Sequence, residues 1–133
     1  MVGIGPAAPY PGGLSRLRKD PMTPAQLDTA CLALTGATKV VQWGGSEVYK
    51  VGGKIFAIVG LGGRLMFKVT DLAYEVMTES GMARPAPYLA RAKWVSFDDL
   101  EGLDPDEVAD WLKTAHRLVA AKLTRAKRSE LGL

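Results

Sequence analysis

A short segment of the chain, residues 84–94, alternates cationic and aromatic side chains. Its cations and rings are Arg84, Tyr88, Arg91, Lys93 and Trp94. Cations bind phosphate groups and exposed rings stack on bases, a combination used by proteins that bind single-stranded nucleic acid. Trp94 has a second interpretation as a core residue between sheet and helix, because it begins a strand-like pattern. The segment is therefore one candidate nucleic-acid interface.

A second candidate lies in two stretches with a period of two, residues 54–59 and 64–69. If these are neighbouring strands, one face is apolar and forms the core, with Ile55, Ala57, Val59, Leu65, Phe67 and Val69. The other face mixes cations with apolar side chains: Lys54, Phe56, Ile58, Arg64, Met66 and Lys68. Such a face could bind a phosphate backbone, or it could be an ordinary solvated face with lysine stems covering apolar neighbours. Lys50 adds a cation nearby.

Other residue types that could do chemistry lack the necessary spacing. His116 is the sole histidine, with no cysteine or carboxylate at zinc-ligand spacing, and Cys31 lies on an apolar helical stripe. The seven carboxylates of residues 98–110 do not match a calcium-binding loop, and helix capping with a solvated face explains most of them. The glycines of residues 60–63 match no nucleotide-binding motif. We expect no catalytic residue, cofactor or metal, and thus no enzyme.

Local sequence signals predict the elements that position these residues. Helices are expected to begin after Thr23, Thr70 and Asp104, which precede apolar residues at helical spacing. Paired glycines separate β-branched and aromatic runs into strands at residues 38–43, 47–51, 54–59 and 64–69, and a further strand follows at 93–97. The predicted order is α-β-β-β-β-α-β-α, an α+β fold in which helices cover an antiparallel meander. The basic run from Lys122 to Arg128 is placed at the far end of the last helix.

Length and composition favour one domain. The chain has 133 residues and 47% hydrophobic residues, enough for a single core. We expect a domain at residues 22–128, a five-residue tail at 129–133, and a disordered leader at 1–21 that is an expression remnant or an over-extended start. The single cysteine and the absence of a long apolar stretch favour a cytoplasmic protein without a membrane segment.

Charge is segregated along the chain. Residues 38–97 carry eight basic and four acidic side chains, residues 98–112 carry seven acidic ones, and residues 113–133 carry six basic ones and one acidic one. The acidic stretch would repel a polyanion. Any nucleic acid is therefore expected on the side of the sheet and the 84–94 segment.

Several short motifs, in this order, resemble the MmcQ/YjbR family. They are Val51-Gly52-Gly53-Lys54-Ile55-Phe56-Ala57, Lys68 at the end of the next strand, Trp94-Val95 after a proline-bearing loop, His116-Arg117-Leu118-Val119 and Lys122-Leu123. The resemblance covers about residues 23–128. It implies an α+β fold with helices on an antiparallel sheet, similar to secretion chaperones, and a double-wing DNA-binding motif. The loop at residues 82–89 lacks the histidine and asparagine that many members carry before the tryptophan.

Two functional hypotheses follow. The first is a bacterial, monomeric DNA-binding protein that contacts phosphates non-specifically through nine residues, Lys50, Lys54, Arg64, Lys68, Arg84, Tyr88, Arg91, Lys93 and Trp94. The second is a protein-interaction or chaperone-like module whose mixed sheet face receives a peptide or helix. An enzyme or small-molecule binder remains a third class, which an apolar pocket with converging polar groups would favour.

Overall fold

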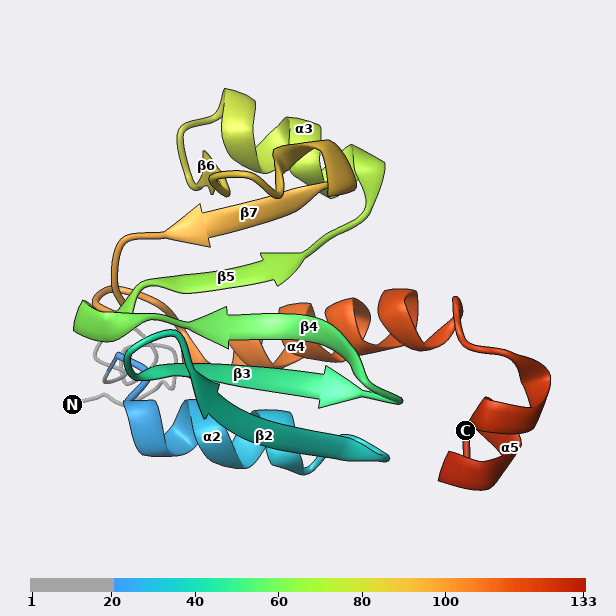
Figure 1. Ribbon diagram of the computed structural model, residues 1–133. Coiled ribbons are helices and arrows are strands. Elements are labelled where there is room, and N and C mark those ends of the chain that lie inside the picture. The colour runs from blue at the N-terminus through green and yellow to red at the C-terminus, as the bar shows by residue number, and fades with distance from the viewer. Residues whose placement is uncertain (1–20) are drawn as a thin grey trace, which may run out of the picture.

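The computed structural model describes residues 21–133 (Figure 1). The expected leader therefore lies, apart from Pro21, outside the described residues. The elements are α2 (Pro24–Leu32), β2 (Ala37–Gln42), β3 (Ser46–Val51), β4 (Lys54–Val59), η1 (Leu61–Gly63), β5 (Leu65–Lys68), α3 (Asp71–Glu79), β6 (Arg84–Pro85), η2 (Ala90–Ala92), β7 (Trp94–Phe97), α4 (Pro105–Ala120) and α5 (Arg125–Leu131). The predicted α+β class is confirmed. The sequence prediction missed the two-residue strand β6 and the separate helix α5.

The six strands form one antiparallel sheet in the order β2-β3-β4-β5-β7-β6. Strands β2 to β5 follow one another as a meander, as the glycine pairs predict. The chain then crosses through α3, and β7 pairs with β5. On the far side of β7, Arg84 and Pro85 of β6 lie opposite Ser96 and Val95. The 84–94 segment therefore contains the edge strand β6 and the connection from β6 to β7.

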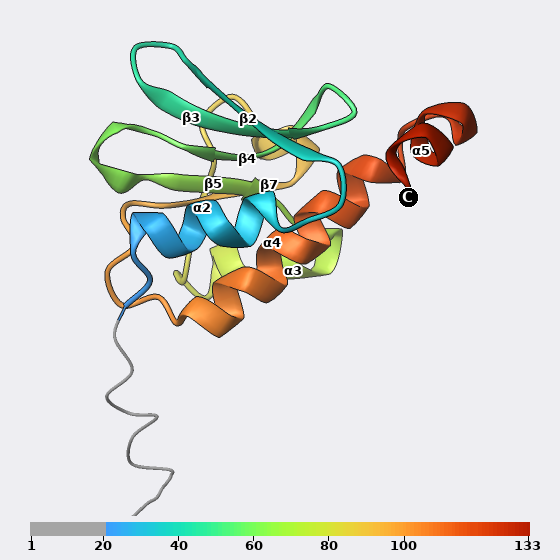
Figure 2. The same cartoon turned by 90° about the horizontal axis from the view of Figure 1, so that it is seen from below.

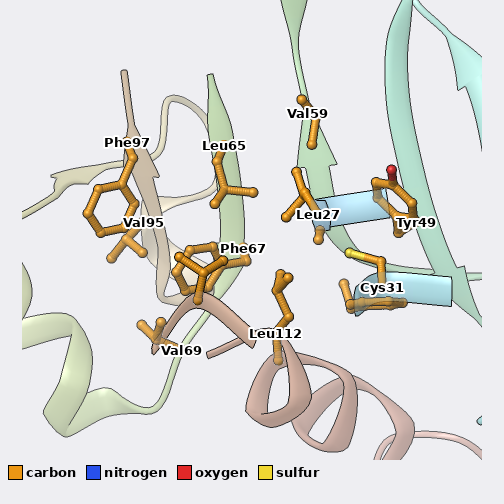
Figure 3. Close-up of a cluster of buried hydrophobic side chains, with 14 of the residues drawn as sticks. Leu27, Cys31, Tyr49, Val59, Leu65, Phe67, Val69, Val95, Phe97 and Leu112 are labelled. Carbon is orange, nitrogen blue, oxygen red and sulfur yellow. The ribbon is translucent and has the colours of Figure 1, made fainter. Parts of the chain in front are cut away.

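Helices α2, α3 and α4 lie on one face of the sheet, which we call the inner face (Figures 1 and 2). Helix α4 packs on β3, β4 and β5, α2 on β2 and α4, and α3 on β6 and β7. The core fills the space between these helices and the sheet (Figure 3). In it, the rings of Phe67, Phe97 and Trp111 stack on one another, with centroids 5.3–6.0 Å apart and planes within 21°.

The predicted helix starts are confirmed by their caps. The hydroxyl of Thr23 accepts from the N–H of Gln26, whose side chain accepts from the N–H of Thr23 in return. The side chain of Thr70 accepts from the N–H of Ala73, and Asp104 accepts from the N–H of Asp106. Each bond satisfies a backbone donor that has no partner inside its helix.

A β-bulge in β4 changes which side chains face outward. Tyr49 lies opposite Ala57, but the next residue, Lys50, lies opposite Ile55, so that Phe56 is an extra residue in its strand. Phe56 is fully buried in the inner core, where its ring packs edge to face with the ring of His116, with centroids 5.4 Å apart. Ile55 instead packs against the outer-face cluster. The prediction that Phe56 and Lys54 share the outer face with Ile58 is therefore wrong, because the simple alternation stops at the bulge.

The last helix of the prediction is two helices. Helix α4 ends at Ala120, and Thr124 caps a second helix by accepting from the N–H of Lys127. The guanidinium of Arg128 donates to the carbonyls of Leu123, at 2.9 Å, and Ala121, at 3.3 Å. The basic run expected at the far end of one long helix is therefore split, with Lys122 in the connection and the rest on α5.

Candidate nucleic-acid interface

The middle of the outer sheet face is apolar and covered. One cross-strand row contains Val40, Val48, Ile58, Met66, Ser96 and Arg84, each opposite the next. Its central members Val48, Ile58 and Ser96 are buried. Ala86 and Leu89, from the segment between β6 and β7, pack here with Ile58 and Trp94. The expected cationic platform across this face is therefore absent.

Trp94 is one of the residues that close this face. Its side chain is 6% exposed, and it packs with Ile58 and Ala86. The interpretation of Trp94 as a core residue placed it between the sheet and a helix, but Trp94 lies on the opposite side of the sheet. A buried ring has no free face for a base, so Trp94 is not a stacking residue of the interface.

Arg64 and Arg84 gather around a carboxylate at one end of the sheet. Arg84 lies 3.2 Å from Asp98 and Arg64 lies 3.9 Å from it. Arg64 also donates to the hydroxyl of Ser96 at 3.4 Å. Two cations that share one carboxylate leave a net charge of only one for an external anion.

The opposite end of the sheet collects lysines from distant parts of the sequence. Figure 1 shows that the β3–β4 turn, the end of β5 and the end of α4 all lie at this end of the molecule. We call the four lysines found there the basic end: Lys54, Lys68, Lys93 and Lys122. Within residues 21–133, none of the four takes part in a salt bridge.

Lys68, like Lys93, is a half-buried member of the basic end. Its Nζ donates to the backbone carbonyl of Ala92 in η2. Burial lowers the pKa of Lys68, and the charges of Lys122 and, more weakly, Lys93 lower it further, whereas Asp71 acts in the opposite direction. Lys122 and Lys93, from two other segments of the chain, therefore both act on the charge of Lys68.

The other members are held by packing. Lys93 follows η2 in a left-handed conformation, with φ of 65°, and its ammonium lies 4.9 Å from the centroid of the Tyr74 ring. Lys122 precedes Leu123, whose side chain packs against Gly52 of the β3–β4 turn. A methyl group on Gly52 would meet Leu123 at 2.6 Å, so only glycine permits this approach. The contact brings Lys122 and the turn that precedes Lys54 to the same end.

Three further predicted residues belong to this half of the outer surface. Lys50 lies opposite Thr38 and Ile55 near the end of β3. On the segment between β6 and β7, Tyr88 is fully exposed and Arg91 is exposed. Of the nine predicted site residues, the structure thus brings six toward one end, separates Arg64 and Arg84 from them, and buries Trp94.

Carboxylates occupy the opposite end of α4. The predicted capping role of Asp104 is confirmed, and Asp99 accepts from the N–H of Glu101 at 2.9 Å. Helix α4 has 16 residues and is therefore about 24 Å long. The charge segregation of the sequence becomes a separation in space, with the acidic stretch at the start of this helix and Lys122 beyond its end.

The other candidate residues, His116 and Cys31, are buried in the core. His116 is buried, with its Nε2 2.7 Å from the carbonyl oxygen of Thr35. Cys31 is fully buried, and burial raises its pKa to about 12, so it is a poor nucleophile. Residues 21–133 contain no cluster of three His, Cys, Asp or Glu side chains suited to a metal ion. No helix in this part of the chain is long and apolar enough to cross a bilayer.

A shallow groove lies between α2 and the start of α4. Its volume is about 370 Å³, and it is lined by Met22, Ala25, Gln26, Thr29, Ala30, Pro105 and Ala109. The lining contains no titratable side chain. The groove therefore offers no acid, base or nucleophile to a bound molecule.

Sequence reasoning did not place Lys122 in the interface. The signal was present in the basic composition of residues 113–133, but the position of Lys122 depends on where α4 ends and on the contact of Leu123 with Gly52. Trp43 was also missed. It is 61% exposed with φ of 52° in the turn between β2 and β3, and an aromatic residue directly before two glycines is a signal for such an exposed turn position.

An antiparallel sheet with three helices on its inner face and a covering segment on its outer face defines an α+β domain. The YjbR family model matches residues 32–118, and the chain belongs to this family. The fold is similar to the crystal structure of the Deinococcus radiodurans protein DR2400, which contains a DUF419 domain. That likeness has a TM-score of 0.71 and 25% identity, and covers 80% of this chain and 86% of the other. No curated protein matches the sequence.

Proposed function

We propose that this domain binds the phosphate backbone of nucleic acid without sequence preference, and that it does so through the basic end. This keeps the predicted ligand class but moves the interface from the sheet face to one end of the sheet. The supporting observation is the gathering of Lys68, Lys93 and Lys122, none of which has a salt bridge among the described residues, while the charges of Lys122 and Lys93 act on Lys68. Phosphate groups bound among these lysines would offset the repulsion between their ammonium groups, and this favours binding.

Salt dependence tests the proposal directly. If four phosphates are contacted, the logarithm of the binding constant falls against the logarithm of salt concentration with a slope of about −3 to −4. The sequence of the oligonucleotide should have little effect. A slope near zero, or no binding at low salt, contradicts the proposal.

A matched pair of double variants locates the interface. Lys54→Ala with Lys122→Ala removes two cations from the basic end, and should reduce the size of the salt slope by about 2. Arg64→Ala with Arg84→Ala removes two cations that share Asp98, and should change it much less. Equal losses in the two double variants would place binding elsewhere or show that only total charge matters.

A protein-interaction role is the second candidate, and the open edge of the sheet at β2 supports it. Val40, Val41 and Trp43 are 42%, 60% and 61% exposed along this edge. The N–H of Ala37 donates to Leu34 rather than to β3, so by alternation the N–H of Val41 also points away from the sheet. An extended peptide could add here as a further strand. The opposite edge, β6, is only two residues long and contains Pro85, which prevents such pairing.

Replacement of Val41 by proline tests the second candidate. Proline removes the outward N–H that an added strand would need. Strand addition at the β2 edge is supported if a partner binds the wild-type protein after nuclease treatment and independently of salt, but does not bind Val41→Pro. A partner whose binding is unaffected by this variant would exclude it.

A further inference from the structure

Tyr88 is fully exposed and makes no packing contact that would explain an aromatic residue at this position. Its relative exposure is 104%, the largest among the large apolar and aromatic side chains of residues 21–133. Its backbone is left-handed, with φ of 66°, a conformation that favours glycine over residues with a Cβ atom. A tyrosine at this position therefore destabilises the folded state, and no burial of its side chain offsets this effect.

The residues on either side of Tyr88 are firmly anchored. Ala86 is 1% exposed and donates to the carbonyl of Trp94 at 3.1 Å. Leu89 donates to the carbonyl of Ala86 at 3.1 Å and accepts from the N–H of Trp94 at 3.3 Å, while its side chain packs against the outer-face cluster. Two proline residues, Pro85 and Pro87, further restrict the backbone. The ring of Tyr88 is thus presented to solvent from a fixed segment.

The same segment leads into the basic end. Arg91, which is exposed and has no salt bridge among the described residues, follows Tyr88 by three positions. Lys68 bonds to the carbonyl of Ala92, and Lys93 is the next residue. The aromatic ring and the cations that would hold phosphates therefore belong to one structural unit.

We infer that Tyr88 stacks on an unpaired base, so that the preferred ligand is single-stranded nucleic acid. This inference rests on the proposed phosphate binding at the basic end. Bases of a duplex are already stacked on both faces, whereas a single strand exposes base faces that an aromatic side chain can cover. The phosphates beside the stacked base lie against Arg91 and the lysines of the basic end. Buried Trp94, six residues on, takes no part in stacking.

Substitution by glycine separates loss of the ring from loss of the fold. Tyr88→Gly removes the ring at a position where glycine is favoured, so its thermal stability should equal or exceed that of wild type. Tyr88→Phe keeps the ring without the hydroxyl. We expect Tyr88→Gly to bind a thymidine oligonucleotide of about 12 nucleotides at least about 10-fold more weakly than wild type, and Tyr88→Phe to bind nearly as well.

An oligonucleotide of the same length that lacks its bases distinguishes stacking from phosphate contact. Wild type and Tyr88→Gly should bind this abasic strand equally, and both should bind the matching duplex equally. If Tyr88→Gly binds the thymidine strand as well as wild type does, or loses duplex binding to the same extent, stacking is refuted while phosphate binding stands. If wild type binds none of the three ligands at low salt, the proposed function fails, and the stacking inference fails with it.

Discussion

The side chain of Lys68, at the end of β5, donates a hydrogen bond to the backbone carbonyl of Ala92 in η2. A central strand of the sheet is thereby connected to the segment that presents Tyr88 and Arg91. Lys68 is held at this point although burial, and then the neighbouring lysine charges, oppose its own charge. The hydrogen bond orders the segment, and the unfavourable charge makes the end of the sheet attractive to anions.

Replacement of Lys68 by methionine tests whether the charge of Lys68 destabilises the fold, because this effect depends on pH. The pKa of Lys68 is lowered in the folded protein, so the unfolded chain holds this proton more tightly. The charged form destabilises the fold at neutral pH, and the penalty is relieved as pH rises through the lowered pKa toward 10.5. We expect the free energy of unfolding of wild type to rise relative to that of Lys68→Met over this interval, measured by urea denaturation. Parallel curves for the two proteins would contradict this effect.

Asp28 links α2 to the edge of the sheet and gives a pH dependence of the same sign, but in the acid range. Its carboxylate accepts from Lys39 and from the hydroxyl of Tyr49, each at 2.8 Å, and these two bonds, that of Lys39 first, lower its pKa. The stabilisation is present above pH 3.8 and is lost as pH falls through the lowered pKa. We expect Asp28→Ala to reduce the free energy of unfolding by about 1 kcal/mol at neutral pH, and by less in acid.

A double-mutant cycle with Tyr49→Phe identifies the bond that matters. If part of the cost comes from leaving the buried hydroxyl without an acceptor, Asp28→Ala should cost less in the Tyr49→Phe background than in wild type. An equal cost in both backgrounds would assign the effect to Lys39 alone.

Gly52 and Gly53 provide a matched pair for the contact that positions Lys122. Both have positive φ, 59° and 83°, but only a side chain on Gly52 would collide with Leu123. We expect Gly52→Ala to destabilise the protein by about 1–3 kcal/mol, and by more than Gly53→Ala. Thermal or urea unfolding measures the difference. In a Leu123→Ala background the two substitutions should become equal, and a persistent difference would point to backbone strain alone.

Arg128 holds α5 against the end of α4, and Lys127 does not. Arg128 bonds to the carbonyls of Leu123 and Ala121, whereas Lys127 makes only a surface pair with Glu130 at 3.8 Å. Arg128→Ala should therefore increase amide hydrogen exchange throughout α5, while Lys127→Ala should leave it nearly unchanged. Equal exchange in the two variants would show that packing of Leu131 alone retains this helix.

The sequence signals that succeeded are local ones. Pro24 and Pro105 mark the first residues of two helices, and the cap residues before them need only the adjacent backbone. Ile58 and Met66 share the outer face as period-two alternation predicts, because no bulge separates them, and they lie opposite each other. These features depend on neighbours in the chain and can be predicted from it.

The failures depend on contacts between distant residues. The bulge at Phe56 places its ring against His116, 60 positions later in the sequence, and alternation within the strand carries no signal for it. Similarly, the sharing of Asp98 by Arg64 and Arg84 requires that β5 and β6 lie on either side of β7. Most of the cations were therefore identified from the sequence, but the position of Lys122, the burial of Trp94 and the division of the cations into two groups were not.

The separation of charge along α4 gives the domain a large electric dipole although its net charge is small, with 14 basic and 13 acidic side chains in residues 21–133. Such a molecule rotates in the field of a charged surface before it touches it. Cation and anion exchange resins should both retain the isolated domain at low salt and neutral pH, each by an opposite end. Reversal of a few charges at one end would abolish retention on one resin and leave the other unaffected.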